Sequence, residues 1–262
     1  MRFVDTTAIV TGGAQGIGRQ TVKILASEGA QVVIADRDRE LAEEARAEAL
    51  ELGAPDAISV EYDVASEDDA RRLADVAATS FGHVDVLVNN AAARVWGPVT
   101  EATAESWNHI VAVNLVGLGL TCKHVIPLMV GRPHAAVVNV SSANGIVGRP
   151  GMAQYDATKA GVLGLTRSMA CDHAGDGIRV NAVLPGPTLT DFHKKRAAAS
   201  GSTIDPSITE PHEGGPGIMR RQGRPEEIAN VIAFLASSQA SYMTGACVSV
   251  DGGLAALSGR LS

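Results

Sequence analysis

The chain has 262 residues, of which 45% are hydrophobic, 19% charged and 3% aromatic, and its formal net charge is −7. This composition excludes a disordered tail, and the acidic balance with so few aromatic residues argues against a nucleic-acid partner. No apolar run is expected to span a membrane, and residues 1–5 show neither a basic leader nor a signal-peptide core, so we expect a cytoplasmic protein. The cysteines have no C-x-x-C spacing and predict neither a metal site nor a disulfide framework; we expect all three to be buried, namely Cys122, Cys171 and Cys247.

Short runs of β-branched residues alternate with longer stretches of helical periodicity. This pattern predicts βαβ units and a parallel sheet with helices on both faces. The expected strands are 7–11, 31–35, 57–62, 84–89, 135–140, 178–184 and 247–250. The expected helices lie near 16–28, 39–52, 67–81, 104–129, 154–173 and 225–237. We therefore predict an α/β fold, doubly wound and Rossmann-type with a seven-stranded parallel sheet, as one domain over residues 1–262.

One segment does not follow this alternation. Residues 188–223 hold clusters of Gly, Pro, Ser and charge with little periodicity. A loop of that length in a compact domain is usually functional or disordered, and we interpret it as a substrate lid. Its cations weakly favour a polar substrate, such as a polyol, cyclic alcohol or hydroxy acid; they are Lys194, Lys195, Arg196 and Arg220.

A glycine-rich turn follows the first expected strand. Its glycines are Gly12, Gly16 and Gly18, in a Gly-x-x-x-Gly-x-Gly spacing that varies the dinucleotide fingerprint. Glycine permits positive φ and close backbone approach, while helix N-terminal amides attract an anion. The turn therefore predicts a site for a dinucleotide pyrophosphate, although a tight turn could use glycine for geometry alone.

Asp36 closes the second expected strand, eighteen residues beyond Gly18. A carboxylate there can accept hydrogen bonds from the adenosine ribose hydroxyls and repels a 2′-phosphate, which favours NAD over NADP. Arg37 points the other way, because a basic neighbour can accommodate that phosphate. Asp63 and Val64 follow the third strand and could meet adenine, although an Asx turn also explains the aspartate.

Tyr155 and Lys159 lie four residues apart at the start of an expected helix, so their side chains share one face. An ammonium near a phenol stabilises the phenolate and suits it to general acid–base chemistry. Ser142 follows the strand 135–140, at the sheet edge where open α/β folds bind ligands. Each of these signals alone is weak, because such patterns are common on helix surfaces and in turns.

Together these residues resemble the short-chain dehydrogenase/reductase family over almost the whole chain. The matching stretches are 11–18, 89–92, Asn114, 141–142, 155–159, 185–186, 223–227 and 251–253. The resemblance implies that Tyr155 donates or accepts the proton, Lys159 favours the phenolate and holds the nicotinamide ribose, Ser142 orients the substrate oxygen, and Asn114 supports a water-linked proton relay. It also implies a nicotinamide cofactor, for which Asp36 favours NAD, and we expect no metal site. The cofactor contacts would come from Gly12, Gln15, Gly16, Ile17, Gly18, Asp36, Asp63, Val64, Asn90, Ala91, Tyr155, Lys159, Pro185, Gly186, Thr188 and Thr190.

The chain departs from the family pattern at two positions. Ala92 replaces the glycine that usually ends Asn-Asn-Ala-Gly, and Thr188 replaces an aliphatic residue. Arg94 and Trp96 follow, where the family often sets substrate specificity, although a surface arginine beside a half-buried tryptophan is an equal interpretation. His193 and His212 in the lid are expected to be solvated, and a substrate role for either one is the alternative.

We therefore predict an NAD-dependent enzyme that moves hydride between nicotinamide and a secondary alcohol or ketone, with a small-molecule substrate and, by the resemblance, a homotetrameric assembly. One alternative is an NADPH-dependent ketoreductase resembling the 3-oxoacyl carrier-protein reductases, which Asp36 disfavours. Another is a non-catalytic dinucleotide-sensing or scaffold protein, since fold does not fix function. The presence of Asn114, Ser142, Tyr155 and Lys159 together argues against the latter.

Overall fold

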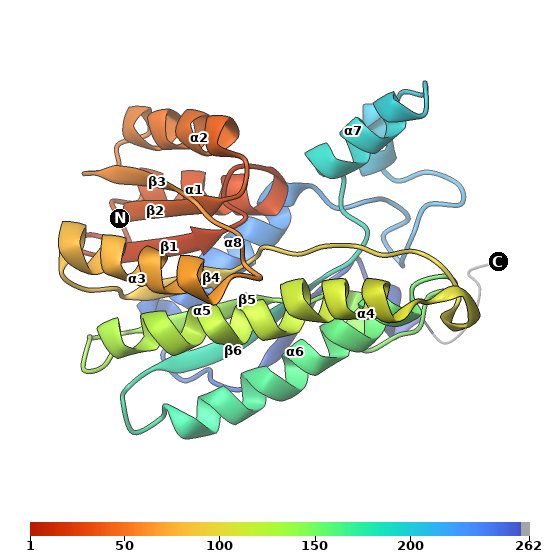
Figure 1. Cartoon of the computed structure of the whole chain (residues 1–262). Helices are drawn as coiled ribbons and strands as arrows, with labels where there is room; N and C mark the ends of the chain where they lie inside the picture. The colour runs from red at the N-terminus through yellow and green to blue at the C-terminus, as the bar shows by residue number, and fades with distance from the viewer. Residues whose placement is uncertain (258–262) are drawn as a thin grey trace.

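The computed structural model describes residues 1–257, apart from the side chains of Phe192, Lys194 and Arg196 (Figure 1). The domain expectation also covered residues 258–262, which lie outside the described part. One sheet carries the parallel strands β3-β2-β1-β4-β5-β6-β7 in that order. The strands are β1 Thr7–Thr11, β2 Gln31–Asp36, β3 Ala57–Glu61, β4 Val86–Asn89, β5 Ala136–Val140, β6 Arg179–Pro185 and β7 Cys247–Val250. This topology confirms the predicted doubly wound fold.

Helices cover both faces of the sheet (Figure 1). One face packs against α1 (Gly16–Ser27), α2 (Arg39–Glu51) and α8 (Pro225–Ala236). The other packs against α3 (Glu67–Phe81), α5 (Gly117–Val125) and α6 (Ala153–Asp172). Because helices cover both faces, every residue of the central strands β1, β4, β5 and β6 is buried.

The site-bearing edge follows from the strand order. β1 pairs with both β2 and β4, so the chain reverses its direction of winding between β1 and β4. Ligands in open α/β sheets bind at the carboxyl ends of the strands beside such a reversal. The turns after β1, β4 and β5 therefore meet at one crevice.

The predicted helix 104–129 is interrupted. The structure has α4 (Ala104–Val111), a π-helical turn over Ala112–Val116, α5, and a 3₁₀ turn over Ile126–Leu128. The π turn contains buried Asn114. A single wide turn leaves hydrophobic periodicity almost unchanged, so the sequence pattern did not reveal it, and such turns are frequent at functional sites.

The same stretch bears on the expectation that no segment spans a membrane. Ala104–Leu128 is long and apolar enough to cross a membrane by length and composition, with a mean hydropathy of 1.5. Leu118, Cys122 and Val125 on α5 are nevertheless buried among the residues of α3 and the sheet. A core helix of a folded domain meets the same criterion, and the packing of α5 is that of a core helix.

The cysteine expectation is wrong at two positions. Cys122 is buried as predicted, but Cys171 on α6 is exposed and Cys247 on β7 is half-buried. Cys171 lies near the end of α6, on the side of the helix away from the sheet. The small, apolar side chain of cysteine was therefore not enough to predict burial.

The segment 188–223 contains more regular structure than expected. It forms α7 (Asp191–Ala199) and a 3₁₀ turn over Pro206–Thr209. α7 is rich in Lys, Arg and Ala, which favour helix, but it has no apolar stripe, so hydrophobic periodicity could not indicate it. In Figure 1, α7 stands away from the helices that cover the sheet.

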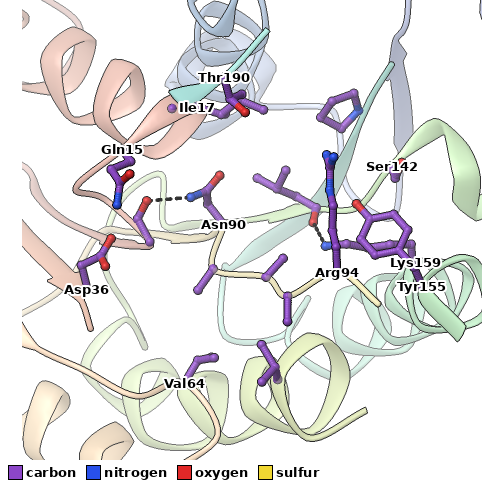
Figure 2. A pocket seen from close by; sticks show the side chains of 18 of the residues that line it. Gln15, Ile17, Asp36, Val64, Asn90, Arg94, Ser142, Tyr155, Lys159 and Thr190 are labelled. Carbon is purple, nitrogen blue, oxygen red and sulfur yellow. Dashed lines mark hydrogen bonds between the residues drawn. The ribbon is translucent and has the colours of Figure 1, made fainter. Parts of the chain in front are cut away.

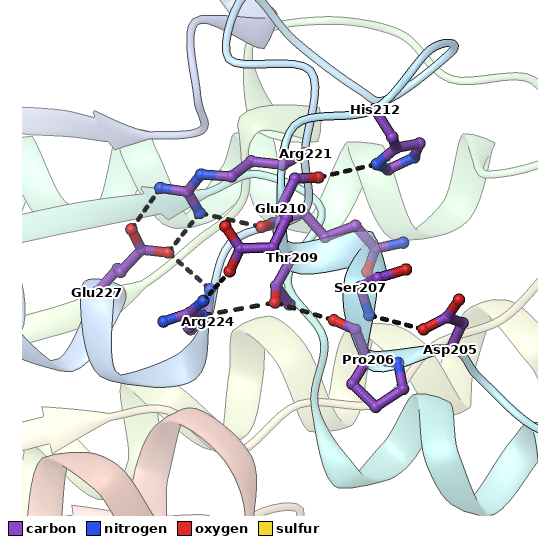
Figure 3. A network of polar contacts seen from close by, with 10 residues as sticks. Asp205, Pro206, Ser207, Thr209, Glu210, His212, Arg221, Arg224 and Glu227 are labelled. Atoms are coloured by element: carbon purple, nitrogen blue, oxygen red, sulfur yellow. Dashed lines mark hydrogen bonds and ion pairs between the residues drawn. The ribbon is translucent and has the colours of Figure 1, made fainter.

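An ion-pair network anchors this segment to α8 (Figure 3). Arg221 donates to both carboxylate oxygens of Glu227, at 2.8 and 2.6 Å, and the Arg224 amide donates to Glu227 at 2.8 Å. The Arg224 guanidinium pairs with Glu210. The hydrogen bonds from Arg221 and from the Arg224 amide lower the pKa of Glu227 to about 2. The stretch 223–227 therefore fixes the base of the segment.

Candidate active site

A cavity of about 850 Å³ opens at the carboxyl ends of the strands. Figure 2 shows Asp36 and Gln15 at one end, and Ser142, Tyr155 and Lys159 at the other. All but two of the predicted catalytic and cofactor residues line the cavity. The exceptions are Gly18 and Asn114, both buried behind its wall.

The glycine-rich turn forms the floor beside α1. Gly12 and Gly16 adopt positive φ of +62° and +55°, which only glycine adopts readily. A Cβ on Gly18 would lie 2.0 Å from the Gly12 carbonyl oxygen, so the third glycine is required for close packing. The turn therefore needs glycine for its shape, and this shape presents the N-terminus of α1 to the cavity.

The N-terminus of α1 already binds an anionic oxygen. The carboxylate of Asp191, at the start of α7, accepts a hydrogen bond from the Gly16 amide at 3.1 Å. Gln15 provides no side-chain cap for α1, and its side chain instead accepts from Lys195 at 2.7 Å. A carboxylate at this amide shows that the turn accommodates negative oxygen, as a pyrophosphate requires.

Asp36 is held by backbone amides. One carboxylate oxygen accepts from the Ala14 amide and the other from the Asp38 amide, both at 3.1 Å. Each oxygen keeps a lone pair for a further donor. The carboxylate is thus fixed at the cavity wall, where a ribose diol can reach it. Arg37 lines the same part of the cavity.

Asp63 and Val64 also line this end. β3 ends at Glu61, and the Asp63 carboxylate accepts from the Ala65 amide at 2.9 Å, which is an Asx turn. Asp63 therefore both forms the expected Asx turn and lines the cavity.

Asn90 and Ala91 join the end of β4 to the glycine-rich turn. The Asn90 side-chain amide donates to the carbonyl oxygens of Thr11 and Gly12, at 3.0 and 2.9 Å. The backbone amides of Asn90 and Ala91 both donate to the Thr11 hydroxyl. These bonds fix the crevice between β1 and β4, a role for Thr11 that the motif alone did not indicate.

Lys159 and Tyr155 are both almost fully buried in α6, at 3% and 6% exposure. The Lys159 ammonium donates to the Val140 carbonyl oxygen at 2.9 Å and lies 5.8 Å from the centre of the Tyr155 ring (Figure 2). Burial lowers the pKa of Lys159 to about 7, and the charge of Arg94 acts in the same direction. The structure therefore brings the predicted pair together, next to the end of β5.

Ser142 lies beside this pair at the end of β5. Its hydroxyl oxygen accepts from the Asn144 amide at 3.1 Å and caps a short 3₁₀ turn. Asn144 in turn donates to Asp156 at 2.7 Å. The Ser142 hydroxyl is thereby held by one local bond, and its own hydrogen remains to be donated.

Asn114 is the buried centre of the π turn. Its side-chain oxygen accepts from the Ala93 amide at 2.8 Å, and its side-chain nitrogen donates to the Ala93 carbonyl oxygen and the Thr158 hydroxyl. It therefore connects the loop after β4 to α6, next to Tyr155. Thr158 was missed from the sequence, although it shares the helical turn of the Tyr155–Lys159 motif.

Pro185, Gly186, Thr188 and Thr190 form the wall after β6. A Cβ on Gly186 would lie 2.6 Å from the Asp251 Cα, so the stretch 251–253 packs directly against it. The Thr188 hydroxyl donates to the Gly186 carbonyl oxygen at 3.0 Å. The departure at Thr188 is thus accommodated by a local hydrogen bond.

The departure at Ala92 is also accommodated. Ala92 is exposed to the cavity, and its φ is not positive, so the missing glycine is not needed for backbone geometry. Arg94 and Trp96 follow on the same loop and line the cavity. His109, on α4, also lines it and was not predicted.

The two lid histidines occupy different places. His193 Nε2 lies 3.1 Å from a guanidinium nitrogen of Arg94. His212 is exposed, with Nδ1 2.9 Å from the Glu210 carbonyl oxygen in the anchor of Figure 3, and it is outside the cavity lining. Only His193 approaches the cavity; the side chains of Lys194 and Arg196 lie outside the described part.

Comparisons with known proteins identify the family. The family model described as "Enoyl-(Acyl carrier protein) reductase" matches residues 12–255. The chain is 41% identical over 256 residues to cis-4-hydroxycyclohexanecarboxylate dehydrogenase of Sinomonas cyclohexanicum, covering 97% of this chain and 98% of that protein. It is 36% identical over 255 residues to 3-oxoacyl-[acyl-carrier-protein] reductase of Thermotoga maritima, covering 97% and 99%.

A solved structure agrees. Ligand-free aldohexose dehydrogenase of Thermoplasma acidophilum superposes with a TM-score of 0.85 at 32% identity, covering 99% of this chain and 97% of that chain. The chain therefore belongs to the short-chain dehydrogenase/reductase family, as predicted. It is an oxidoreductase of the kind that acts on CH–OH groups with a nicotinamide cofactor.

Proposed function

We propose that this chain is an NAD-dependent dehydrogenase of secondary alcohols, with Tyr155 as general acid and base. One observation carries the proposal: a single cavity has Asp36 fixed at one end and Ser142, Tyr155 and Lys159 at the other. Between the two ends, the cavity is lined by the glycine-rich turn and by the crevice between β1 and β4. A dinucleotide is the ligand that needs all of these features in one site.

The residues fit the parts of that cofactor. The α1 N-terminus would bind the pyrophosphate, Asp36 the adenosine ribose, Lys159 the nicotinamide ribose, and Thr188 and Thr190 the carboxamide. When bound, the nicotinamide supplies hydride chemistry. Preference for NAD follows from the Asp36 carboxylate, which offers acceptors to ribose hydroxyls and repels a 2′-phosphate.

The proton chemistry is proposed for this chain's own side chains. Ser142 donates its hydroxyl hydrogen to the substrate oxygen and holds it beside Tyr155. During oxidation the Tyr155 phenolate accepts the alcohol proton, and during reduction the phenol returns it. Lys159 stabilises the phenolate when charged. Asn114, bonded to Ala93 and Thr158, fixes the backbone behind this group.

The segment 188–223 is proposed as the substrate lid of a single-domain enzyme. It contacts the cofactor end through Asp191 and Lys195 and the catalytic end through His193. The Sinomonas relative acts on a cyclic hydroxy acid by its name, which favours a cyclic or acidic alcohol among the classes expected here. A homotetramer and a cytoplasmic location belong to the same proposal; light scattering that shows a monomer would contradict the former.

A second function has specific support. Arg37 lines the cavity next to Asp36, and the Thermotoga relative is a 3-oxoacyl-[acyl-carrier-protein] reductase. An arginine there can bind a 2′-phosphate, so an NADPH-dependent ketoreductase is the alternative.

The test is a spectrophotometric screen with NAD⁺ and NADP⁺ across polyols, cyclic alcohols, hydroxy acids and steroids, and with NADH and NADPH on the matching ketones and a 3-oxoacyl thioester. We expect NAD⁺-dependent oxidation of an alcohol and a higher kcat/KM for NAD(H). A preference for NADPH with the thioester would support the alternative. Turnover that persists in Tyr155→Phe would contradict the catalytic assignment.

A further inference from the structure

The loop after β4 places Arg94 at the catalytic end of the cavity. Its guanidinium carbon lies 5.7 Å from the centre of the Tyr155 ring, and Figure 2 shows its side chain extending alongside that ring. Lys159 approaches the same ring at 5.8 Å. Two cationic side chains therefore flank the proposed acid–base residue, and only one of them, Lys159, has a part in the mechanism described above.

The carboxylates of the described lining are confined to one end of the cavity. Among the described lining residues, the acidic side chains are Asp36 at the end of β2, Asp38 just after it and Asp63 after β3. They share the adenosine end with the cations Arg37 and Lys195. The elements at the catalytic end contribute Arg94 and Lys159 but no carboxylate to the described lining. The part of a ligand that lies at the catalytic end therefore meets two cations and no carboxylate of the described lining.

A histidine of the lid orients Arg94. An arginine only donates hydrogen bonds, so His193 Nε2 accepts from Arg94 at 3.1 Å. On the other side of the ring, His193 Nδ1 lies 2.9 Å from the Thr190 hydroxyl oxygen and 3.3 Å from the Thr190 backbone nitrogen. An imidazole directs a guanidinium without bringing the negative charge of a carboxylate partner. The contact joins the loop after β4 to the lid across 99 residues of sequence.

We propose that Arg94 binds a carboxylate of the substrate, so that the enzyme acts on secondary alcohols or ketones that carry a free acid group. This inference rests on the proposed dehydrogenase function and names its substrate class. A planar guanidinium matches a carboxylate with two parallel hydrogen bonds and one compensating charge. His193 is a positioning residue, because it acts by orienting Arg94.

The charge of Arg94 supports this assignment through its neighbour. Arg94 acts on the buried Lys159 in the direction that disfavours its ammonium form. A bound carboxylate offsets that repulsion, and Lys159 then keeps its charge beside Tyr155. An acid substrate would therefore complete the electrostatics of the catalytic end when it binds.

The test compares hydroxy acids with their primary amides, which keep the shape and lose the charge. The probes are 3-hydroxybutanoate, 4-hydroxypentanoate and 3-hydroxycyclohexanecarboxylate, each with its amide, assayed on wild type, Arg94→Gln, Arg94→Lys and His193→Gln. Arg149→Gln is the control, since it removes one positive charge from the exposed loop between β5 and α6, outside the cavity lining. NADH binding, followed by fluorescence, reports whether each variant keeps its fold and cofactor site.

We expect wild type to prefer at least one acid over its amide. Arg94→Gln should lower kcat/KM for that acid by about 10- to 100-fold, as expected when a hydrogen-bond partner of a charged group is removed, and leave the amide within about threefold. Arg94→Lys should retain part of the preference. His193→Gln should raise KM for the acid with little change in kcat, and Arg149→Gln should change neither substrate.

Three results would overturn the proposal. Wild type could oxidise neutral alcohols and none of the acids, or could use acids and amides equally. Arg94→Gln could lower both substrates equally and shift the pH profile of kcat, which would make Arg94 a positioning residue for Tyr155. All three leave the dehydrogenase function intact, whereas the absence of turnover of any alcohol or ketone with either cofactor would contradict that function instead.

Discussion

The two ends of the cavity are built in different ways. At the adenosine end, Asp36 is fixed by the backbone amides of Ala14 and Asp38, all within one βαβ unit. At the catalytic end, Lys159 is fixed by the Val140 carbonyl oxygen, and Arg94 contacts His193, which lies 99 residues away in the sequence. The proposed cofactor contact thus depends on local backbone geometry, and the proposed substrate contact on side chains that only the tertiary fold brings together.

Replacing Tyr155 by Phe gives the largest expected effect at the catalytic end. The ring and its packing remain, but the proposed proton-transfer group is removed, so turnover should fall by about 10² to 10⁴. NADH affinity, measured by fluorescence, should stay within about twofold of wild type, because the adenosine end is untouched. Near-normal turnover would remove Tyr155 from the mechanism; joint loss of fold and NADH binding would make it structural.

Replacing Asp36 by Ala tests the other end. The variant loses acceptors for the ribose hydroxyls and no longer repels a 2′-phosphate, while Arg37 remains to attract it. The ratio of kcat/KM for NAD to that for NADP should fall by about 10- to 100-fold. The control is Asp68→Ala, which removes the same charge from the exposed surface of α3. An equal ratio in both variants would mean that Asp36 does not face the ribose.

Replacing Lys159 by Met should separate activity from stability. Turnover and cofactor affinity should both fall, because the variant lacks the proposed ribose contact and the cation beside Tyr155. The fold should become more stable, since the burial that lowers the pKa of Lys159 to about 7 opposes its charged form.

The pH dependence of this gain has a definite sign. Wild-type Lys159 is charged in both states below about pH 7, so its burial cost is complete there. Between pH 7 and its ordinary value of about 10.4, the unfolded chain binds more protons and the cost declines. The difference in Tm between variant and wild type should thus be largest below pH 7 and decrease at alkaline pH, as read by calorimetry. A lower Tm for the variant at pH 6 would contradict this account.

The smallest effect concerns the base of the lid. Glu227→Gln removes the carboxylate that binds Arg221 and the Arg224 amide, and its partial exposure limits the loss in the free energy of unfolding to about 1 kcal/mol or less. The pKa of Glu227 is lowered to about 2, so the wild-type contribution is present above about pH 4.5 and lost as the pH falls toward 2.

The variant should therefore differ from wild type at pH 7 and match it near pH 2 in chemical unfolding. Glu226→Gln, on the exposed neighbour, is the control and should behave as wild type at both values. A deficit for Glu227→Gln that persists at low pH would show that packing, and not the ion pair, accounts for its contribution.

Local sequence predicted the parts of the site that depend on backbone shape. The turn at Gly12, Gly16 and Gly18 was predicted because glycine is the residue type that tolerates positive φ and close backbone packing at these positions. The pair Tyr155 and Lys159 was predicted to share a helix face because four residues make about one turn. The π turn at Asn114 and the helix α7 were missed, since neither changes the hydrophobic period by which helices are recognised.

The sequence by itself determined the order of strands and helices along the chain, the glycine-rich turn after β1 and the family to which the chain belongs, because these follow from periodicity and from residue types at fixed spacing. It left Arg94 as either a surface group or a substrate contact. Only the tertiary structure placed Arg94 beside Tyr155 and in contact with His193. Contacts between side chains so far apart depend on how the sheet and lid pack, and no local pattern encodes them.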